Sequence, residues 1–383
     1  MCFNGILQKI FSPVMHQKCL TNLILFVESS LNQKIISLTS LGRNLNLQIK
    51  ERSCIRRSDR FIGNDNLYNS LHNIYKKFSD SIIGNKKRPK IIVDWSQVPN
   101  TKCHMLRAAL VTKRHAISFY DEVHKEEYLN NCDIELKFLT TLKTILPTEC
   151  KPIIITDAGF RNPWYKQIIN LGWDYVGRVR GTPHYFDGSV WKPCQKLLSQ
   201  AKIEQRYVGR QILGKTNPIE THLHLIKQKS KNRKTTRRKP GGKRDELNYR
   251  RSGKEAWLLA SSLSGENFIK LNRVYKIYNS RMQIEQCFRD LKSPHVGFGM
   301  RNAYSRDPKR IQILLLIAML SAWIALLIGH YIETKKIHYD FQSNSVKNKR
   351  VISLVYLGCR ALARKVPLPN ISIILAGFTG EIW

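Results

Sequence analysis

Short, β-branched apolar runs alternate along the middle of the chain with longer segments in which apolar residues recur every three or four positions. The runs are bounded by Lys or Pro and are too short for helices, which is typical of buried strands. The pattern predicts strands at 90–95, 105–111, 115–120, 152–157 and 174–178, with helices at 131–145 and 163–171. This order of elements predicts a mixed α/β sheet with helices packed on it.

The regions on either side of this pattern differ from it. The segments 22–31, 38–45 and 52–62 have the apolar spacing of short helices, and the third is rich in arginine, including Arg56, Arg57 and Arg60. A basic helix after two apolar ones indicates a helix-turn-helix-like reader of duplex DNA, and an ordinary helical bundle with a basic surface is the alternative. Between 184 and 272, short alternating segments predict an inserted, mostly antiparallel β subdomain.

The most apolar segment, 313–329, contains no charged side chain. Its length is at the lower limit for a membrane span, and basic residues flank it on both sides. A helix that is apolar all round is also typical of a buried core. The pattern alone leaves both interpretations open.

The net charge of the chain indicates what kind of partner it binds. The chain has 64 Lys and Arg against 28 Asp and Glu, a formal net charge of +36. A chain with so large an excess of positive charge is hard to keep compact without an anionic partner, and nucleic acid is the obvious one.

The nine cysteines are scattered, odd in number and without a Cys-x-x-Cys pair. Their pattern is typical of reduced thiols and argues against a disulfide framework or a zinc site.

Candidate chemistry is concentrated in 278–292. If this segment is one helix, Tyr278, Arg281, Glu285 and Lys292 fall within about 60° of each other around its axis. A carboxylate beside a phenol, a guanidinium and an ammonium fits a site that holds a metal ion next to phosphates. The alternative is an amphipathic surface helix with a solvated charged edge.

Two further carboxylates close predicted strands. Asp94 follows Ile92 and Val93, and Asp157 follows Ile155 and Thr156. A single Asp in such a place is commonly a helix cap or a turn former. Two of them together with Glu285 favour a divalent metal site, because neighbouring carboxylates repel each other unless cations neutralise them.

With these residues the chain resembles the DDE transposases of the bacterial insertion-sequence family numbered four. The order Asp94, Asp157, Glu285 and the spacing from Tyr278 to Lys292 match that family, and the resemblance runs from about Leu38 to about Gly358. The sequences around the motifs match as well: VDWS at 93–96, DAGF at 157–160, PWYK at 163–166, RVRG at 178–181, RMQIE at 281–285 and FRDLKSP at 288–294.

The resemblance implies a ribonuclease-H-like (DDE) catalytic core with an inserted antiparallel β subdomain and a helical N-terminal DNA-binding region. It places 313–329 as a core helix rather than a membrane span. The expected divisions are a DNA-binding region at 1–80, the first part of the core at 87–183, the insertion at 184–272, the second part at 273–330 and a helical C-terminal region at 331–383. We expect the end beyond about Val366 to be shorter than in the family, which would affect contacts between subunits.

The resemblance further implies cut-and-paste transposition. Asp94, Asp157 and Glu285 are expected to hold two Mg²⁺ ions, with Mn²⁺ as a substitute, during cleavage at the terminal inverted repeats through a DNA hairpin and joining to target DNA. The expected partners are double-stranded DNA and a second subunit in a dimeric synaptic complex, and the expected location is the cytoplasm, at the nucleoid. Gln286 and Cys287 depart from the family's pattern. A catalytically impaired derivative that only binds the repeats is the alternative, and a membrane-associated basic protein is a distant third.

The resemblance also assigns DNA contacts. Trp257 matches a tryptophan that stacks on a nucleotide flipped out near the transposon end, and its alternative role is to fill the core. We expect the phosphates around that nucleotide to be clamped by Tyr278, Arg281 and Lys292, assisted by Arg289. The basic segment 227–251 is expected to lie along the DNA backbone. Asp290 falls on another face of the predicted helix and is excluded as a ligand.

Overall fold

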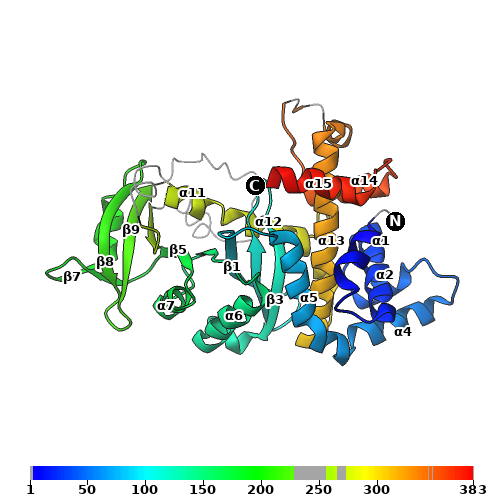
Figure 1. The fold of residues 1–383 in the computed structure, drawn as a ribbon, viewed down its shortest axis with the longest axis horizontal. Coiled ribbons are helices and arrows are strands. Elements are labelled where there is room, and N and C mark those ends of the chain that lie inside the picture. The colour runs from blue at the N-terminus through cyan, green and yellow to red at the C-terminus, as the bar shows by residue number, and fades with distance from the viewer. Residues whose placement is uncertain (1–2, 228–255, 265–272, 344, 347, 383) are drawn as a thin grey trace, which may run out of the picture. The chain divides into compact units, whose positions relative to one another are not determined.

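The structure is a computed structural model that describes residues 3–227, 256–264, 273–343, 345–346 and 348–382 (Figure 1). The chain forms two compact units. Unit 1 comprises Met1–Cys150 together with Met282–Trp383, and unit 2 comprises Lys151–Arg281. Unit 2 is therefore inserted between the two halves of unit 1. Each unit is described by itself.

Unit 1 begins with five helices: α1 (Asn4–Phe11), α2 (Gln17–Gln33), α3 (Leu38–Arg43), α4 (Glu51–Ile62) and α5 (Asp65–Ile83). Side-chain oxygens cap two of them, since Ser37 accepts from the amide of Ser40 and Asn64 from that of Leu67. The helices predicted at 22–31 and 52–62 are confirmed within α2 and α4, and the one predicted at 38–45 is confirmed as α3, which ends two residues earlier, at Arg43.

Three antiparallel strands follow, in the order β3-β2-β1: β1 (Lys90–Gln97), β2 (Cys103–Leu110) and β3 (Ile117–Lys125). Every residue of β2 is buried, as expected for the central strand of the three. A short 3₁₀ turn, η1 (Glu126–Tyr128), leads to α6 (Cys132–Ile145). Unit 1 resumes with α12 (Met282–Lys292), η2 (Met300–Asn302), α13 (Pro308–Thr334), η3 (Ile337–Phe341), α14 (Leu354–Ala363) and α15 (Ile371–Ile382).

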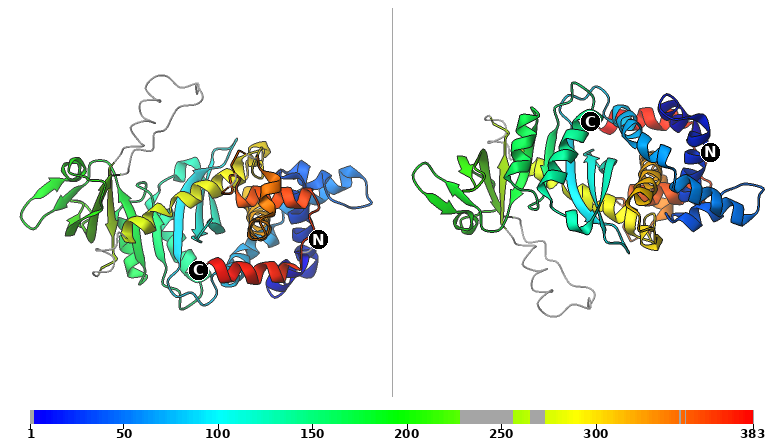
Figure 2. Two further views of the ribbon diagram at one scale, coloured as in Figure 1. Left: turned by 90° about the horizontal axis from the view of Figure 1, so that it is seen from above. Right: turned by 90° about the horizontal axis from the view of Figure 1, so that it is seen from below.

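The core of unit 1 is built around α13. This helix packs against β3, α2 and α14, and Figure 2, which views it nearly end on, shows helices from both ends of the chain around it. It is long and apolar enough to cross a membrane by length and composition, but 94% of its most apolar window is buried inside the protein. A buried core helix, as the resemblance implies for 313–329, accounts for this burial.

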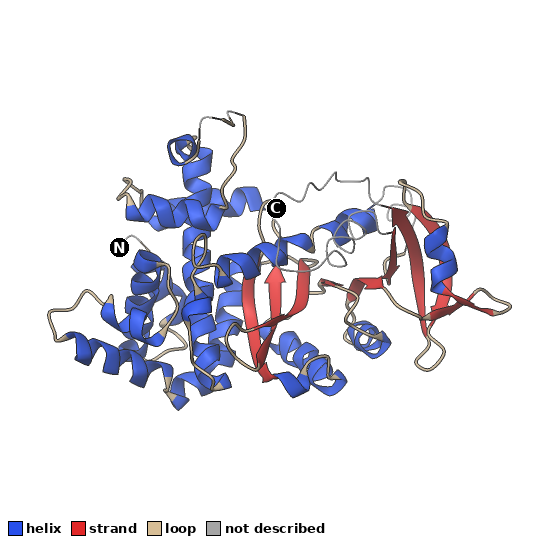
Figure 3. Cartoon of the chain, turned by 180° about the vertical axis from the view of Figure 1, so that it is seen from behind, coloured by secondary structure: helices blue, strands red, loops and turns tan. Residues whose placement is uncertain are grey.

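Unit 2 contains a second group of strands, in the order β4-β5-β10-β9-β8-β6-β7. Among the described strands of unit 2, β4 (Ile153–Thr156) and β5 (Asp174–Val179) pair in parallel, and α7 (Asn162–Asn170) connects them. The others are antiparallel: β6 (His184–Phe186), β7 (Trp191–Pro193), β8 (Arg206–Leu213), β9 (Ile219–Lys227) and β10 (Ala256–Ser261). Helix α8 (Cys194–Ser199) packs against β10, and α11 (Arg273–Asn279) against β5 (Figure 3). The mixed α/β class predicted from the sequence is confirmed.

The crossing of α13 and α14 depends on two glycines. A Cβ added to Gly358 would lie 1.9 Å from the carbonyl oxygen of Ala325, and one added to Gly329 would lie 1.9 Å from that of Leu354. Since heavy atoms cannot approach so closely, the two helices pack backbone against backbone only because both positions lack a side chain.

We therefore expect Gly358→Ala to destabilise the protein by about 1–3 kcal/mol, because the helices must separate to admit one methyl group. Gly377→Ala in α15 is the matched control. Its Cβ would meet nothing within 4 Å, so the better helix propensity of Ala should leave stability unchanged or raise it by up to about 1 kcal/mol. Urea unfolding of the two variants measures both effects, and equal midpoints would contradict the close crossing.

Candidate active site

Asp94 lies inside a strand rather than at its end. β1 continues through Trp95 and Ser96 to Gln97, and Asp94 is paired with Arg107 of β2. The prediction that Asp94 stands at the end of a strand at 90–95 is wrong, because the polar residues after it still find β2 partners for their backbone groups. The Asp94 side chain is 8% exposed. It is therefore held in a fixed place by the sheet.

Lys292 lies near both Asp94 and Glu285. Its ammonium Nζ donates a hydrogen bond to Ser96 Oγ at 2.7 Å, two residues beyond Asp94. Burial lowers the pKa of Lys292 to about 8, and the nearby carboxylates of Glu285 and Asp94 act in the opposite direction and raise it. Both carboxylates thus lie within electrostatic reach of one half-buried ammonium. The sequence predicted Lys292 as a phosphate clamp but gave no signal for its bond to Ser96.

The predicted continuous helix from Tyr278 to Lys292 is wrong. α11 ends at Asn279 and α12 begins at Met282. Ser280 Oγ donates to the carbonyl of Ile277 at 2.6 Å, and the amide of Arg281 donates to that of Tyr278 at 2.9 Å, which closes a turn. Short polar side chains such as that of Ser280 compete for backbone groups and favour helix ends. The helical spacing therefore applies only within α12.

Within α12 the spacing separates two faces. Glu285 and Arg289 are exposed, and Lys292 is half-buried beside them, whereas Ile284, Phe288 and Leu291 are in the core; Cys287 is buried as well. Arg289 donates to Gln286 Oε1 at 3.1 Å. The carboxylate of Asp290 is buried and bonded to His115, so it faces away from Glu285 as the spacing predicted.

A buried ion pair supports the base of α12. Arg107 donates from Nε and Nη2 to the two carboxylate oxygens of Asp121, at 2.7 and 2.8 Å, and both residues are almost fully buried. The Arg107 guanidinium lies 5.6 Å from the Phe288 ring centroid, and Lys292 Nζ lies 5.4 Å from the same ring. Phe288 is thus in contact range of two cations, an arrangement that fixes the ring below Lys292.

Asp157 begins the candidate site of unit 2. It directly follows β4, as predicted, and its Oδ1 accepts a hydrogen bond from the amide of Gly159 at 2.7 Å. Burial raises the pKa of Tyr278. The charges of Arg281 and Arg178 lower this pKa, and the charge of Asp157 raises it. These four residues therefore lie in one electrostatic neighbourhood, although they come from three separate stretches of the sequence.

Trp257 is half-buried in β10 and lies among these residues. Its ring packs edge-on against Tyr278, with 5.1 Å between centroids and an interplanar angle of 78°, and the guanidinium of Arg178 lies 5.6 Å from its centroid. A tryptophan that only filled the core would be fully enclosed. Arg178 was quoted in a motif but given no role from the sequence, since an Arg near the end of a strand has many possible partners.

A basic cleft of about 470 Å³ opens beside Asp157 in the same unit. It lies between the start of α7, the loop after β5 and the turn between β8 and β9. The basic side chains that line it are Arg161, Arg178, Arg180 and Lys215, together with the imidazole of His184. Asn162 Nδ2 fixes the β8–β9 turn by donating to the carbonyls of Leu213 and Asn217, each at 2.7 Å. The cleft is thus a braced, cationic surface with the chemistry to bind phosphates.

Comparison with known proteins decides the family. The family model for the transposase DDE domain matches residues 86–322, more than half of the chain, and this range contains Asp94, Asp157 and Glu285. The chain belongs to the transposase DDE domain family. It is therefore a DDE transposase, an enzyme that acts on DNA, and such transposases use divalent metal ions. No curated protein matches the chain.

The donor chemistry of the transposase fits such an ion. Asp94 and Glu285 in unit 1 and Asp157 in unit 2 offer hard carboxylate oxygens, which Mg²⁺ prefers. Among the described residues there is no group of three or more His, Cys, Asp or Glu side chains that could hold a metal ion by itself. The joint site of the three carboxylates, which belong to different units, is therefore taken up as a proposal below.

Two other groups of predicted DNA contacts belong to other parts of the sequence. In α4 of the transposase, Arg56 and Arg60 are exposed, whereas Arg57 is half-buried and donates to Asn22 Oδ1 of α2 at 2.7 Å. Arg57 thus braces two helices. The predicted backbone-binding segment 227–251 lies almost wholly outside the described residues, which end at Lys227 and resume at Ala256.

The support below α12 gives a stability prediction. Asp121→Ala should cost about 3–5 kcal/mol, because it leaves the buried Arg107 guanidinium without its partner. Glu220→Ala removes an acid from the Arg210 pair, in which both side chains are more than half exposed, and should change stability by at most about 1 kcal/mol. Urea unfolding compares the two variants, and similar losses would show that Arg107–Asp121 is not the anchor described.

Proposed function

We propose that this DDE transposase is a cut-and-paste enzyme of insertion-sequence family four, nearest to the transposase of insertion sequence ten. In this proposal its core is ribonuclease-H-like, with the β-rich part of unit 2 as the insertion and α1–α5 as the DNA-binding region. The observation that carries the proposal is the position of Asp94 and Glu285 around the Lys292 ammonium, within the range matched by the transposase DDE domain.

Asp94, Asp157 and Glu285 are proposed as the ligands of two Mg²⁺ ions, with Mn²⁺ as a substitute. When bound, the ions supply the positive charge that activates the attacking oxygen and stabilises the leaving one at phosphorus. Lys292 fits a supporting role, because an ammonium tied to Ser96 keeps two carboxylates together until the ions neutralise them. The exposed carboxylate of Glu285 is accessible to the DNA.

The proposed reaction has four displacements at phosphorus. Water first hydrolyses one strand at the transposon end, which frees a 3′ hydroxyl. That hydroxyl attacks the opposite strand and displaces the flanking DNA, which leaves a hairpin. A second water opens the hairpin, and the same 3′ hydroxyl then attacks a target phosphodiester and displaces its 3′ oxygen. The hairpin step needs sharply distorted DNA, for which a flipped-out base is useful.

The cluster around Trp257 suits that distorted intermediate. The half-buried ring, with Arg178 near it and Tyr278 at its edge, offers a stacking platform next to groups that bind phosphate. Arg281 belongs to this cluster, while Arg289 and Lys292 offer further cations on α12. The basic cleft beside Asp157 continues the cationic surface of unit 2 and is proposed to hold the DNA backbone.

Recognition of the terminal inverted repeats is assigned to α4. Arg56 and Arg60 are exposed on this helix and available to base edges or phosphates, and Arg57 has the supporting role described above. A dimer in the synaptic complex and a cytoplasmic, nucleoid-associated location complete the proposal. An impaired derivative that binds repeats without cutting them is the alternative outcome of the first test below.

That test is the replacement of Asp94, Asp157 or Glu285 singly by Ala. Each variant should bind terminal-repeat DNA nearly as the parent does and lose Mg²⁺-dependent nicking, because the ligands act on the chemistry while the basic surface supplies affinity. Gel-shift titration and a nicking assay on end-labelled DNA measure the two properties. A variant that nicks at the parental rate would exclude its residue as a ligand, and a parent that binds repeats without nicking would favour the impaired derivative.

Trp257→Ala tests the stacking platform. Stacking on a flipped base contributes about 1–3 kcal/mol, whereas truncation of a buried Trp costs about 3–5 kcal/mol of stability. The variant should keep a near-parental melting temperature, make the first nick and accumulate nicked DNA, because the hairpin forms poorly. A substrate that lacks the base to be flipped should partly restore hairpin formation. A large drop in melting temperature with uniform loss of nicking would assign Trp257 to the core.

The basic cleft is tested by neutralising Arg161, Arg180 and Lys215 together to Gln. Affinity should fall on all DNA sequences alike, and the slope of log affinity against log salt should flatten by about 0.9 for each phosphate that the cleft no longer neutralises. The matched control neutralises Lys151, Lys196 and Lys202, three exposed lysines of unit 2 that do not line the cleft. If both triple variants changed the slope equally, the cleft would have no special part in binding.

A further inference from the structure

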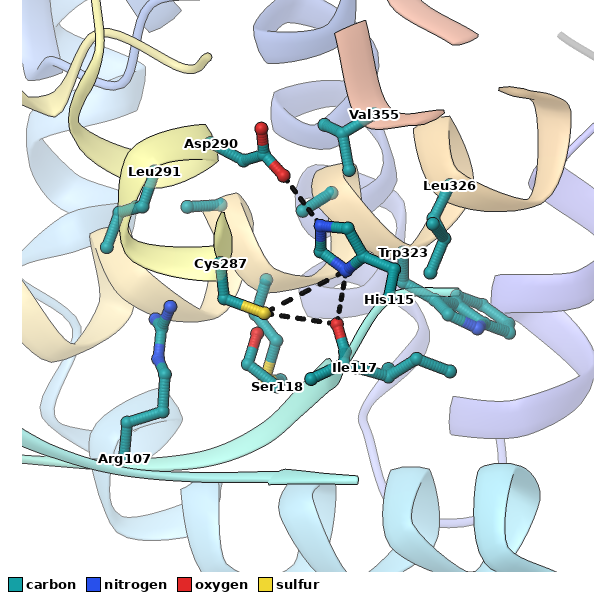
Figure 4. Close-up of a pocket in the computed structure, with 14 residues that line it drawn as sticks. Arg107, His115, Ile117, Ser118, Cys287, Asp290, Leu291, Trp323, Leu326 and Val355 are labelled. Atoms are coloured by element: carbon teal, nitrogen blue, oxygen red, sulfur yellow. Dashed lines mark hydrogen bonds and ion pairs between the residues drawn. The ribbon is translucent and has the colours of Figure 1, made fainter. Parts of the chain in front are cut away.

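Behind the catalytic face of α12 lies a buried cluster formed by His115, Cys287 and Asp290 (Figure 4). His115 belongs to the segment between β2 and β3, and the other two residues belong to α12. The His115 side chain is 7% exposed and that of Asp290 is 2% exposed. Neither group has a part in the proposed chemistry, so the structure must offer another reason for placing an ionisable pair in the core.

Both ring nitrogens of His115 face oxygen acceptors. Nε2 lies 2.7 Å from Asp290 Oδ2, and Nδ1 lies 2.6 Å from the carbonyl oxygen of Ala116. A neutral imidazole has one N–H and would direct a lone pair at one of these oxygens. With the Asp290 carboxylate ionised, both nitrogens must carry hydrogen to satisfy these two contacts. In that state His115 is an imidazolium that donates to Asp290 and to the backbone.

The surroundings favour this charged form. Burial lowers the pKa of His115, but the charge and the hydrogen bond of Asp290, together with the contact with Cys287, raise that pKa well above its ordinary value. From β2, Arg107 is the charged group that lines the same cavity. The helices α13 and α14 contribute only apolar side chains to its lining: Ala318, Met319, Ala322, Trp323, Leu326 and Val355. The carboxylate of Asp290 is thus the anionic partner that His115 meets across the helix packing.

The same side of α12 makes two further bonds to this segment. Gln283 Nε2 donates to the carbonyl of Thr112 at 2.9 Å, and Cys287 Sγ donates to that of Ala116 at 3.1 Å. At 100° per residue, Gln283, Cys287 and Asp290 lie about 140–200° around the helix from Glu285. The segment 112–116 therefore binds α12 on the side opposite its catalytic carboxylate.

Asp290 also ties α12 to the start of α14. Its Oδ1 accepts from Gln286 Nε2 at 2.8 Å and from Ser353 Oγ, just before α14, at 3.2 Å. Gln286 and Cys287, the two departures from the family's pattern noted in the sequence, both belong to this set of contacts. A neutral His115 would lose one of its two hydrogen bonds and leave the carboxylate of Asp290 without its buried counter-ion.

We propose that His115 is a positioning residue for Glu285: as an imidazolium bonded to Asp290, it fixes the rotation of α12 and thereby the place of the Glu285 carboxylate. The inference rests on the proposed role of Glu285 in catalysis. Its physical basis is that a shift of about 1 Å in a catalytic group can cost about 100-fold in rate, and that α12 is a short helix whose far side is bonded to this segment and, through Asp290, to Ser353.

The test compares Asp290→Asn and His115→Gln with the parent. Asp290→Asn keeps the size of the side chain but removes the charge that stabilises the imidazolium. We expect DNA affinity to stay within about twofold, the rate of nicking of pre-bound DNA to fall about 10- to 100-fold, and amide hydrogen exchange in α12 of the metal-free protein to speed up. A loss of nicking rate as the pH rises through the pKa of His115 should appear only in the parent, which alone holds a complete pair. Gly377→Ala in α15, whose added Cβ would meet nothing within 4 Å, is the control and should keep its nicking rate.

A spectroscopic readout tests the protonation state directly. In the parent labelled with ¹⁵N-histidine, both ring nitrogens of His115, assigned by their loss in His115→Gln, should give protonated signals at neutral pH. Asp290→Asn should convert one of them to the unprotonated type. A neutral His115 ring in the parent would overturn the proposal. The proposal would also be overturned if Asp290→Asn converted the signal but kept the parental nicking rate and the parental hydrogen exchange of α12. If the parent did not nick DNA, or if Glu285→Ala nicked it normally, the proposed function would be wrong whatever His115 does. In that case the hydrogen exchange of α12 still tests the positioning role, which would be refuted by unchanged exchange in Asp290→Asn and His115→Gln.

Discussion

The burial of α13 is the constraint on which unit 1 depends. Nearly every side chain from Ile311 to His330 is enclosed, and β3, α2, α12 and α14 all pack against this one helix. Each large aliphatic side chain buried in this way contributes about 1.5–3 kcal/mol. Because the strands that hold Asp94 and the helix that carries Glu285 both belong to this assembly, the separation of the two carboxylates is set by packing around α13 and by the backbone-to-backbone crossing at Gly329 and Gly358.

Much of this fold was predictable because it follows from local pattern. The strands at 90–95 and 152–157 and the helices at 131–145 and 163–171 appear close to their predicted bounds, since β-branched runs and helical spacing report burial directly. The predicted end of the first strand and the predicted continuous helix at 278–292 were wrong, in both cases because backbone hydrogen bonds extend or end an element where the side-chain pattern does not show it. β1 continues past Asp94 because β2 supplies partners, and the helix breaks at Ser280 and Arg281 because turn bonds replace helical ones.

The site was predictable in its residue types but not in its contacts. Carboxylates, a phenol and cations at recognisable spacing identified the candidate residues, whereas the bond between Lys292 and Ser96 joins positions 196 residues apart and leaves no periodic signal. The same holds for Arg178 beside Trp257 and for His115 beside Asp290. Such pairs are set by tertiary packing. The sequence showed that Gln286 and Cys287 depart from the family, but only the structure supplied partners for them.

The insertion of unit 2 within unit 1 has a consequence for how the protein is made. His115 is synthesised 175 residues before Asp290, which corresponds to roughly 10–35 s at about 5–20 residues per second. During that interval Lys151–Arg281 emerges as a continuous stretch and can fold as a unit, while the first half of unit 1 still lacks α12, α13 and α14. The strand bearing Asp94 is therefore exposed on the nascent chain long before the helix bearing Glu285 exists. A chain that ends within unit 2 after Asp157 has two of the three proposed metal ligands but lacks α13, so on this proposal cleavage competence is acquired only near the end of translation.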